Sequence, residues 1–304
     1  MPLHLVCDYG ASVEAFRAIL RTEQGIQSVH IKDHTHRRTP LRILSSRLNM
    51  NEVQSMLKRL RELRSREREL QGLLNSSAHF GTDNGNSNDT PRAGGAVVNT
   101  NDDDRNYRDS LDRIENEIDD LKRRDFWRKV VLLAVTDFYS PQSVFIDDYM
   151  DDGSVGDDQS LDENRFKIVH ACAGISKCPP TMLELAILLH PYQLMERDRD
   201  TGRLPIHIAL ETRGTSVLFD ILEWTPAEAM IVRDNSGMLP IEVALSVGRR
   251  WGNGVGAVLA VAPTVLETLD VCDSLYPMIW SKLYNKGGPD ALYVAICARP
   301  GLFS

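Results

Sequence analysis

Histidine is the first residue type in this sequence that suggests chemistry. The run "DTGRLPIHIAL" at residues 200–210 places His207 among aliphatic side chains, where an imidazole can act as a general base or a metal ligand. Two further groups contain the residue types that bind zinc, namely His30, His34 and His36 beside Asp33, and His170 with Cys172 and Cys178. The elements that carry these residues decide between chemistry and a structural role.

Other signatures of catalysis and ligand binding fit poorly. The run "GNGVG" at 252–256 lacks the G-x-G-x-x-G spacing and the preceding strand of a dinucleotide loop. The acidic run at 147–164 carries eight carboxylates, but Tyr149 or Met150 interrupts each calcium-loop register. The sequence also lacks nucleophile-elbow, P-loop and zinc-protease motifs. We therefore expect no cofactor, no resident metal and no enzyme activity. The alternative is an enzyme or metal-binding protein with a site between repeats.

Composition and charge limit the class of protein. The 304 residues are 42% apolar and 26% charged, as in an ordinary globular protein, and the net charge of −8 disfavours general nucleic-acid binding. Five scattered cysteines indicate reduced thiols rather than a disulfide framework. Neither a signal peptide nor an apolar run of about 18 residues is visible. We expect an intracellular protein, cytoplasmic rather than nuclear, that binds neither nucleic acid nor membrane.

The stretch that contains His207 recurs along the chain. "PIHIAL" at 205–210 has relatives in "PLHLVC" at 2–7, "PLRILS" at 40–45, "IVHACA" at 168–173, "PIEVAL" at 240–245 and "YPMIWS" at 276–281. Neighbouring starts lie 38 residues apart from Pro2 to Pro40, 37 from Ile168 to Pro205 and 35 from Pro205 to Pro240. A period of this length is typical of a stacked supersecondary unit rather than of a catalytic motif.

Each unit has the same internal pattern. A turn rich in Asp, Asn or Gly precedes a short helix that begins at proline, because proline fits the first helical position. A glycine eight or nine residues later, such as Gly10 or Gly248, suits the left-handed residue that ends a helix. A second helix then carries apolar residues at helical spacing, namely Val13, Phe16, Ile19 and Leu20 in the first unit and Val217, Leu218, Ile221 and Leu222 in the fourth.

These motifs resemble the signature of ankyrin repeats. The resemblance rests on "PLHLVCDYGA" at 2–11, "TPLR" at 39–42 and "DTGRLPIHIAL", and "HACAGISKCPPTMLELAILLHP" at 170–191 is similar to divergent ankyrin-like proteins of algae. It covers residues 1–60 and 166–304. It implies an adaptor in which His4, His170 and His207 link neighbouring repeats through their ring nitrogens. Arg42 and Glu242 occupy the same position in other units, so we do not expect a shared catalytic role there.

Residues 52–165 interrupt the repeats. Two stretches follow the spacing of a coiled-coil seam: residues 56, 60, 63, 70 and 74 with Glu67 at the missing step, and Tyr107, Leu111, Ile114, Ile118 and Leu121. Six basic and four acidic residues over 52–70, against four and six over 105–122, favour an antiparallel hairpin, with two independent solvated helices as the alternative. We expect disorder over 76–104, a buried helix over 126–135 and an acidic loop at 147–164.

The sequence therefore predicts an all-α fold, an ankyrin-like α-solenoid of helix-turn-helix repeats with a long helical and disordered insertion. The expected segments are first repeats at 1–60, a coiled-coil-like hairpin at 61–125, a helix and acidic loop at 126–165, and C-terminal repeats at 166–304. The chain begins inside a motif, at Pro2. We therefore expect either upstream sequence or a partner for the exposed face of "LHLVC".

The predicted function is non-catalytic binding of a partner protein on the concave surface of the repeats. In such a stack the turns and the exposed faces of the first helices point into the groove and are not needed for stacking. The predicted partner-binding residues in units four and five are Arg199, Arg203, Glu211, Asn235, Met238 and Trp251. The alternative for the arginines is solvation of a turn, and the alternative for Trp251 is inward packing.

Overall fold

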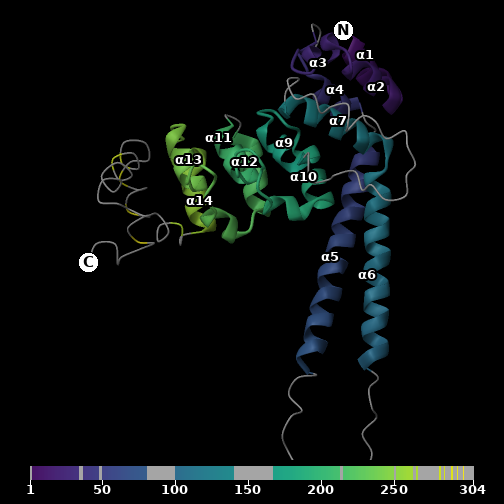
Figure 1. Cartoon of the computed structure of the whole chain (residues 1–304), viewed down its shortest axis with the longest axis vertical. Helices are drawn as coiled ribbons and strands as arrows, with labels where there is room; N and C mark the ends of the chain where they lie inside the picture. The colour runs from purple at the N-terminus through teal and green to yellow at the C-terminus, as the bar shows by residue number, and fades with distance from the viewer. Residues whose placement is uncertain are drawn as a thin grey trace, which may run out of the picture. The chain divides into compact units, whose positions relative to one another are not determined.

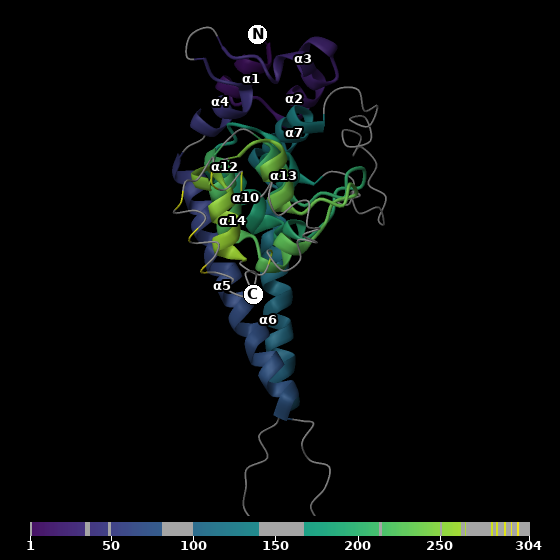
Figure 2. The same cartoon turned by 90° about the vertical axis from the view of Figure 1, so that its left-hand side faces the viewer.

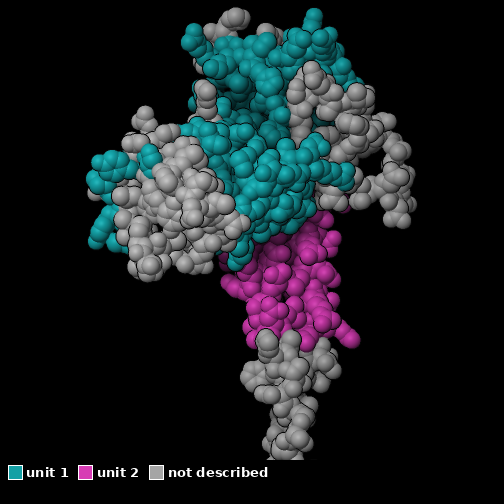
Figure 3. Space-filling model, turned by 60° about the vertical axis from the view of Figure 1, so that its left-hand side comes forward, with its two compact units in different colours: residues 1–48, 129–304 teal, residues 49–128 magenta. Residues whose placement is uncertain are grey.

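The computed structural model describes a helical protein (Figure 1). Among the described residues every regular element is a helix, so the all-α prediction is confirmed for them. The described residues are 2–33, 37–47, 50–80, 100–139, 167–212, 215–249 and 251–262, with a few isolated positions after them. The chain divides into two compact units, Met1–Leu48 with Lys129–Ser304, and Asn49–Arg128, which Figure 3 colours teal and magenta.

Proline starts the first helix of four repeats. These helices are α1 (Pro2–Tyr9), α4 (Pro40–Arg47), α11 (Pro205–Glu211) and α13 (Pro240–Ser246). The proline ring fixes φ near its helical value and removes an amide that would have no partner in the first turn. The corresponding helix of the third repeat, α9 (Ile168–Gly174), begins at isoleucine instead. The predicted short helix is therefore confirmed in the first five repeats.

A second helix follows the first in most of these repeats. The second helices are α2 (Val13–Leu20), α10 (Pro180–Leu189), α12 (Thr215–Trp224) and α14 (Val255–Val261). Their predicted apolar positions form the core, since Phe16, Leu20, Val217 and Ile221 are fully buried. Short helical segments lead on to the next turn: α3 (Glu23–Ser28), η1 (Pro191–Leu194) and η2 (Ala227–Ile231), while η3 (Trp251–Asn253) precedes α14.

The first helices of successive repeats lie side by side. α9 packs against α11 and α11 packs against α13, while α10 packs against α12 and α12 against α14. Ala209 and Ala244 occupy equivalent positions in α11 and α13 and are fully buried, as is Ala171, which lies one position earlier in α9. Their small side chains allow the helices to approach closely. The shared core of the C-terminal repeats therefore lies between these two rows of helices.

Helix α7 (Asp125–Tyr139) extends this core toward the N-terminal repeats. The Lys129 ammonium lies 5.7 Å from the centre of the Phe16 ring in α2. At the other end of α7, a Cβ added to Gly174 of α9 would come within 2.1 Å of the Phe138 ring. The predicted buried helix over 126–135 is confirmed, because Val130, Leu133 and Ala134 are fully buried.

The second compact unit is a helical hairpin. Its helices α5 (Met50–Phe80) and α6 (Thr100–Lys122) run side by side in opposite directions (Figures 1 and 2). The predicted seam is confirmed, since it contains Met56, Leu60, Leu63, Ile114, Ile118 and Leu121, each at most 5% exposed. Across the hairpin, Arg59 Nε and Nη2 lie 2.5 and 2.8 Å from the two carboxylate oxygens of Glu117. The hairpin, not the pair of independent helices, is therefore the structure.

Both hairpin helices extend further than the sequence predicts. α5 continues to Phe80 and α6 begins at Thr100, so both ends of the predicted disordered segment 76–104 are helical. The residues after Leu74 are mostly polar, so the sequence pattern does not show that the helix continues. The helix can continue because each further residue gains a hydrogen bond without the cost of a new nucleus. The predicted boundary at residue 61 also falls inside α5. Residues 81–99, the acidic loop at 147–164 and the motif at 276–281 except Ser281 lie outside the described residues.

Candidate interaction surface

The repeated histidine joins each repeat to the next turn along the chain. The Nε2 atom lies 2.8 Å from Ile31 O in His4, 3.1 Å from Arg203 O in His170 and 3.3 Å from Met238 O in His207. Each carbonyl belongs to the turn that leads into the following repeat. The predicted linking role is therefore confirmed for all three histidines.

His207 also fixes the start of its own helix. The Leu204 amide donates to His207 Nδ1 at 3.2 Å, so the ring proton is on Nε2 and is donated to Met238 O. Glu242 holds the same position in α13, where its carboxylate accepts from the Leu239 amide at 2.7 Å. Both side chains satisfy an amide that the first helical turn leaves without a partner. This shared task explains why glutamate can stand in α13 at the position that His207 holds in α11.

Burial keeps two of these imidazoles neutral. It lowers the pKa of His170 and of His207 from 6.5 to about 4, because a charged ring loses its hydration inside the protein. Both side chains are fully buried. A general base needs access to its substrate, so neither ring is placed for catalysis.

An aspartate organises the turns that precede α4, α11 and α13. Its amide donates to the carbonyl that closes the turn, from Asp33 to Arg38 at 2.9 Å, from Asp198 to Arg203 at 2.8 Å and from Asp234 to Met238 at 2.9 Å. The carboxylate accepts further turn amides, as when Asp234 Oδ1 accepts from Ser236 and Met238 at 2.9 Å each. The turns are therefore held in one shape by their own backbone contacts.

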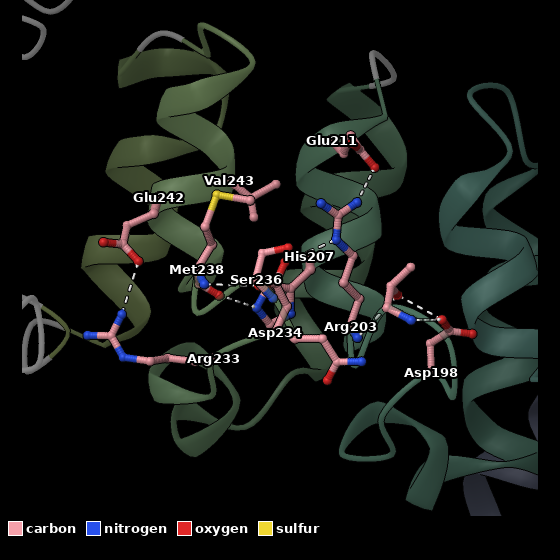
Figure 4. A network of polar contacts seen from close by, with 12 residues as sticks. Asp198, Arg203, His207, Glu211, Arg233, Asp234, Ser236, Met238, Glu242 and Val243 are labelled. Carbon is pink, nitrogen blue, oxygen red and sulfur yellow. Dashed lines mark hydrogen bonds and ion pairs between the residues drawn. The ribbon is translucent and has the colours of Figure 1, made fainter.

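Arg203 connects two successive turns (Figure 4). Its Nε lies 3.2 Å from Asp234 Oδ2 in the next turn, and its Nη1 lies 2.6 Å from Glu211 Oε2. The Asp234 side chain is 1% exposed and that of Arg203 is 18% exposed. The expectation that Arg203 is not needed for stacking is therefore wrong. Its guanidinium compensates a buried carboxylate that belongs to the neighbouring repeat.

Asn235 and Met238 also contribute to stacking, contrary to the prediction. The Asn235 amide donates to Thr201 O at 2.9 Å, and its Nδ2 donates to Asp200 O at 3.1 Å. Met238 acts through its carbonyl, which accepts from His207. The Asn235 N–H and the Met238 carbonyl are backbone groups that any residue supplies, so residue type gave no indication of these two contacts. The Nδ2 contact depends on the asparagine side chain.

The other predicted residues have different surroundings. Arg199 is exposed at the tip of its turn. The Glu211 side chain is 50% exposed and pairs with Arg203. Trp251 begins η3, but its side chain lies outside the described residues. Two successive turns thus share an exposed surface, called here the turn surface, formed by Arg199, Asp200, Thr201, Asn235, Ser236 and Gly237.

The two groups that contain zinc-binding residue types are not assembled into a site within the described residues. His30 Nδ1 lies 2.5 Å from Asp137 Oδ1, whereas His34 and His36 lie outside the described residues. Cys172 and Cys178 are buried thiols. The side-chain hydrogen bond with Cys172 is the largest cause that raises the pKa of Cys178, and burial is the second. Across the described part of the chain, no three His, Cys, Asp or Glu side chains are placed to hold a metal.

Sequence reasoning missed Arg249, which caps a helix of the preceding repeat. Its guanidinium donates to the carbonyls of Ala209, Leu210 and Thr212 at the end of α11, and to Asn253 O in η3. Arg249 is only 9% exposed, and burial lowers its pKa. The acceptors at the end of α11 lie 37 to 40 residues away. In the sequence, the contact could have been suggested only by comparing residues that lie one repeat period apart.

Gly202→Ala should destabilise the protein by about 2–3 kcal/mol, while Gly237→Ala should cost about 1 kcal/mol. Both glycines have positive φ, 66° and 77°. A Cβ at Gly202 would lie 2.1 Å from Asn235 Oδ1 and 3.0 Å from Asn235 N, whereas a Cβ at Gly237 meets nothing within 4 Å. Urea unfolding of the two variants measures the difference. Equal losses would mean that close approach of the turns contributes nothing.

Comparisons with known proteins identify no relative. No family model, no curated protein and no solved structure matches the chain. In the described part of the chain, none of the helices has the length and apolar character needed to span a membrane.

Proposed function

We propose that this protein is a non-catalytic scaffold that binds a partner protein through ankyrin-like repeats, on the turn surface and the adjoining first helices. The observation that carries this proposal is the Arg203 bridge between successive turns. Together with the Asn235 contacts, it holds exposed side chains of two repeats at a fixed spacing. A surface whose backbone is already ordered loses little conformational entropy when it binds a partner.

The buried polar groups favour binding over catalysis. His170 uses its Nε2 and His207 uses both ring nitrogens for backbone contacts, and Arg203 uses its guanidinium for two carboxylates. These imidazole and guanidinium groups therefore hold the repeats together. The buried reduced thiols Cys7, Cys172 and Cys178 support the proposal of an intracellular location.

Arg199→Glu should weaken partner capture at least about tenfold, because a reversed charge at a contact opposes a partner chosen for complementarity. The immobilised protein is used for capture from cell extract, followed by quantitative mass spectrometry. Lys177→Glu is the matched control, since Lys177 is exposed on the α9–α10 loop and outside the turn surface. Arg203→Glu is a poor probe, because it would also leave Asp234 without its bridge.

The two variants separate recognition from loss of structure. The proposal predicts that Arg199→Glu loses specific partners that Lys177→Glu retains, while both variants keep the melting temperature of the unmodified protein. If both variants capture the same proteins as the unmodified chain, Arg199 does not belong to the binding site.

A further inference from the structure

Two cysteines lie at the two ends of the connection between α9 and α10. Cys172 belongs to α9, and Cys178 precedes the first residue of α10 by two positions. The chain turns back between them, since the Ile175 amide donates to Ala171 O at 3.2 Å and the Cys178 amide donates to Ile175 O at 3.0 Å. A side-chain hydrogen bond joins the two thiols. The turn thus brings two sulfur atoms of one repeat into contact.

Neighbouring elements hold this connection in place. Cys172 is 0% exposed and Cys178 is 3% exposed. Gly174, which lies between them, packs so closely on the Phe138 ring of α7 that an added Cβ would lie 2.1 Å from it, and the Gly174 carbonyl accepts from Thr212 Oγ1 at 3.4 Å. A disulfide requires Cβ atoms about 3.5–4.5 Å apart. Thiols that already share a hydrogen bond need only a small shift to reach that geometry.

The remaining cysteines have different surroundings. Cys7 lies in α1, where burial is the largest cause that raises its pKa to about 12. Cys297 is exposed, and Cys272 lies outside the described residues. Cys172 and Cys178 are the two described cysteines whose side chains are hydrogen-bonded to each other, and they are called here the thiol pair.

We propose that the thiol pair is a redox-sensitive site that closes to a disulfide by exchange with glutathione disulfide. First, one cysteine gives its proton to water, and its thiolate attacks one sulfur of glutathione disulfide, whose sulfur–sulfur bond breaks. The other cysteine, deprotonated in turn, then attacks the protein sulfur of the mixed disulfide and expels the second glutathione. Both glutathione thiolates take up a proton. The pair loses two electrons and two protons, and glutathione disulfide becomes two molecules of glutathione.

Burial makes the first step depend on a local opening of the connection. The side-chain hydrogen bond with Cys172, and then burial, hold the pKa of the Cys178 thiol well above its usual value, whereas the thiolate is the form that reacts. In a reducing compartment the pair therefore stays as thiols, and it closes when glutathione disulfide accumulates. The closed bond ties the end of α9 to the start of α10. The proposal is independent of the proposed function, because the turn surface takes no part in it.

Mass spectrometry of tryptic peptides from the purified full chain tests the proposal. The folded chain is incubated with an excess of glutathione disulfide, the remaining thiols are blocked with N-ethylmaleimide in urea, and the digestion contains no reductant. Trypsin cuts after Lys167, Lys177 and Arg197, so a bond within the pair links peptide 168–177 to peptide 178–197. We expect this linked product in most molecules, and a melting temperature that rises by about 5 °C and returns with dithiothreitol.

Cys178→Ala and Cys297→Ser are the two matched variants. Alanine suits the buried position because a buried cysteine packs as a small apolar residue, and circular dichroism checks that the variant is folded. Cys178→Ala should give neither the linked product nor the rise in melting temperature. Cys297→Ser should behave like the unmodified chain, since Cys297 is exposed and outside the pair. A folded, unmodified chain in which Cys172 and Cys178 stay as thiols, or bond to other cysteines instead of each other, overturns the proposal.

Discussion

Acidification from pH 6.5 to about 4 should remove several kcal/mol from the free energy of unfolding. Burial lowers the pKa of His170 and His207 from 6.5 to about 4 in the folded protein. Below pH 6.5 the unfolded chain therefore binds protons that the folded chain does not. Each histidine then reduces stability by about 1.4 kcal/mol per pH unit, and the loss ends near pH 4.

The geometry around His207 gives this sensitivity a structural cause. Its Nδ1 accepts from the Leu204 amide, so a proton on that nitrogen would face a donor and break the contact. His207→Gln retains an acceptor at the third helical position, where glutamine commonly caps a helix, and removes the titrating ring. We expect the variant to lose about half of the histidine-dependent acid sensitivity.

Urea unfolding followed by circular dichroism at pH 7 and pH 4.5 measures this effect. The comparison between the unmodified chain and His207→Gln cancels the carboxylates, including Asp137, whose pKa burial raises despite the opposing effect of His30. Identical pH dependence in the two proteins would show that the buried His207 ring does not control acid stability.

Replacing Arg249 with alanine should cost about 3–5 kcal/mol of stability. The guanidinium satisfies three carbonyls at the end of α11 and one in η3, and its own charge lies in a buried site. The substitution leaves these acceptors inside the protein without their donor. It also removes a cation from the end of a helix where the carbonyls concentrate negative charge.

Two further substitutions test whether the several N–H donors of the Arg249 guanidinium account for the loss of stability. Arg249→Lys should recover only part of the loss, because one ammonium cannot reach all four carbonyls in the planar arrangement of a guanidinium. Arg197→Ala should cost no more than about 1 kcal/mol, since Arg197 is exposed and donates to Arg233 O. Thermal unfolding ranks the three variants. If Arg249→Ala and Arg197→Ala are equally stable, the buried contacts of Arg249 do not hold α11.

The sequence was sufficient to predict features with local causes. Proline starts α1, α4, α11 and α13 because the first helical turn leaves amides without partners, and that requirement is visible in one hexapeptide. The hairpin seam is equally local, because its apolar residues repeat every three or four positions. The structural role of the recurring histidine could be predicted because His4, His170 and His207 hold the same position in different repeats.

Contacts between turns were not predictable in the same way. The turn position of Arg203 predicts a partner-binding residue, because turns in a stack of repeats point into the groove, yet its target Asp234 lies in the following repeat. Asn235 reaches the preceding turn through its backbone N–H, which every residue except proline has, as well as through its side-chain Nδ2. The sequence alone thus predicted two residues of the turn surface, Arg199 and Asn235, but did not separate exposed side chains from those that hold the turns together.

The links between neighbouring repeats determine when each repeat can assemble during synthesis. His4, His170 and His207 reach carbonyls 27, 33 and 31 residues further along the chain, and Arg249 reaches back 40 residues to Ala209. At a translation rate of about 5–20 residues per second, the later residue of each pair emerges about 1–8 s after the earlier one. Each helix pair can therefore dock on its predecessor while the ribosome is still elongating the chain, so the order of docking follows the order of translation.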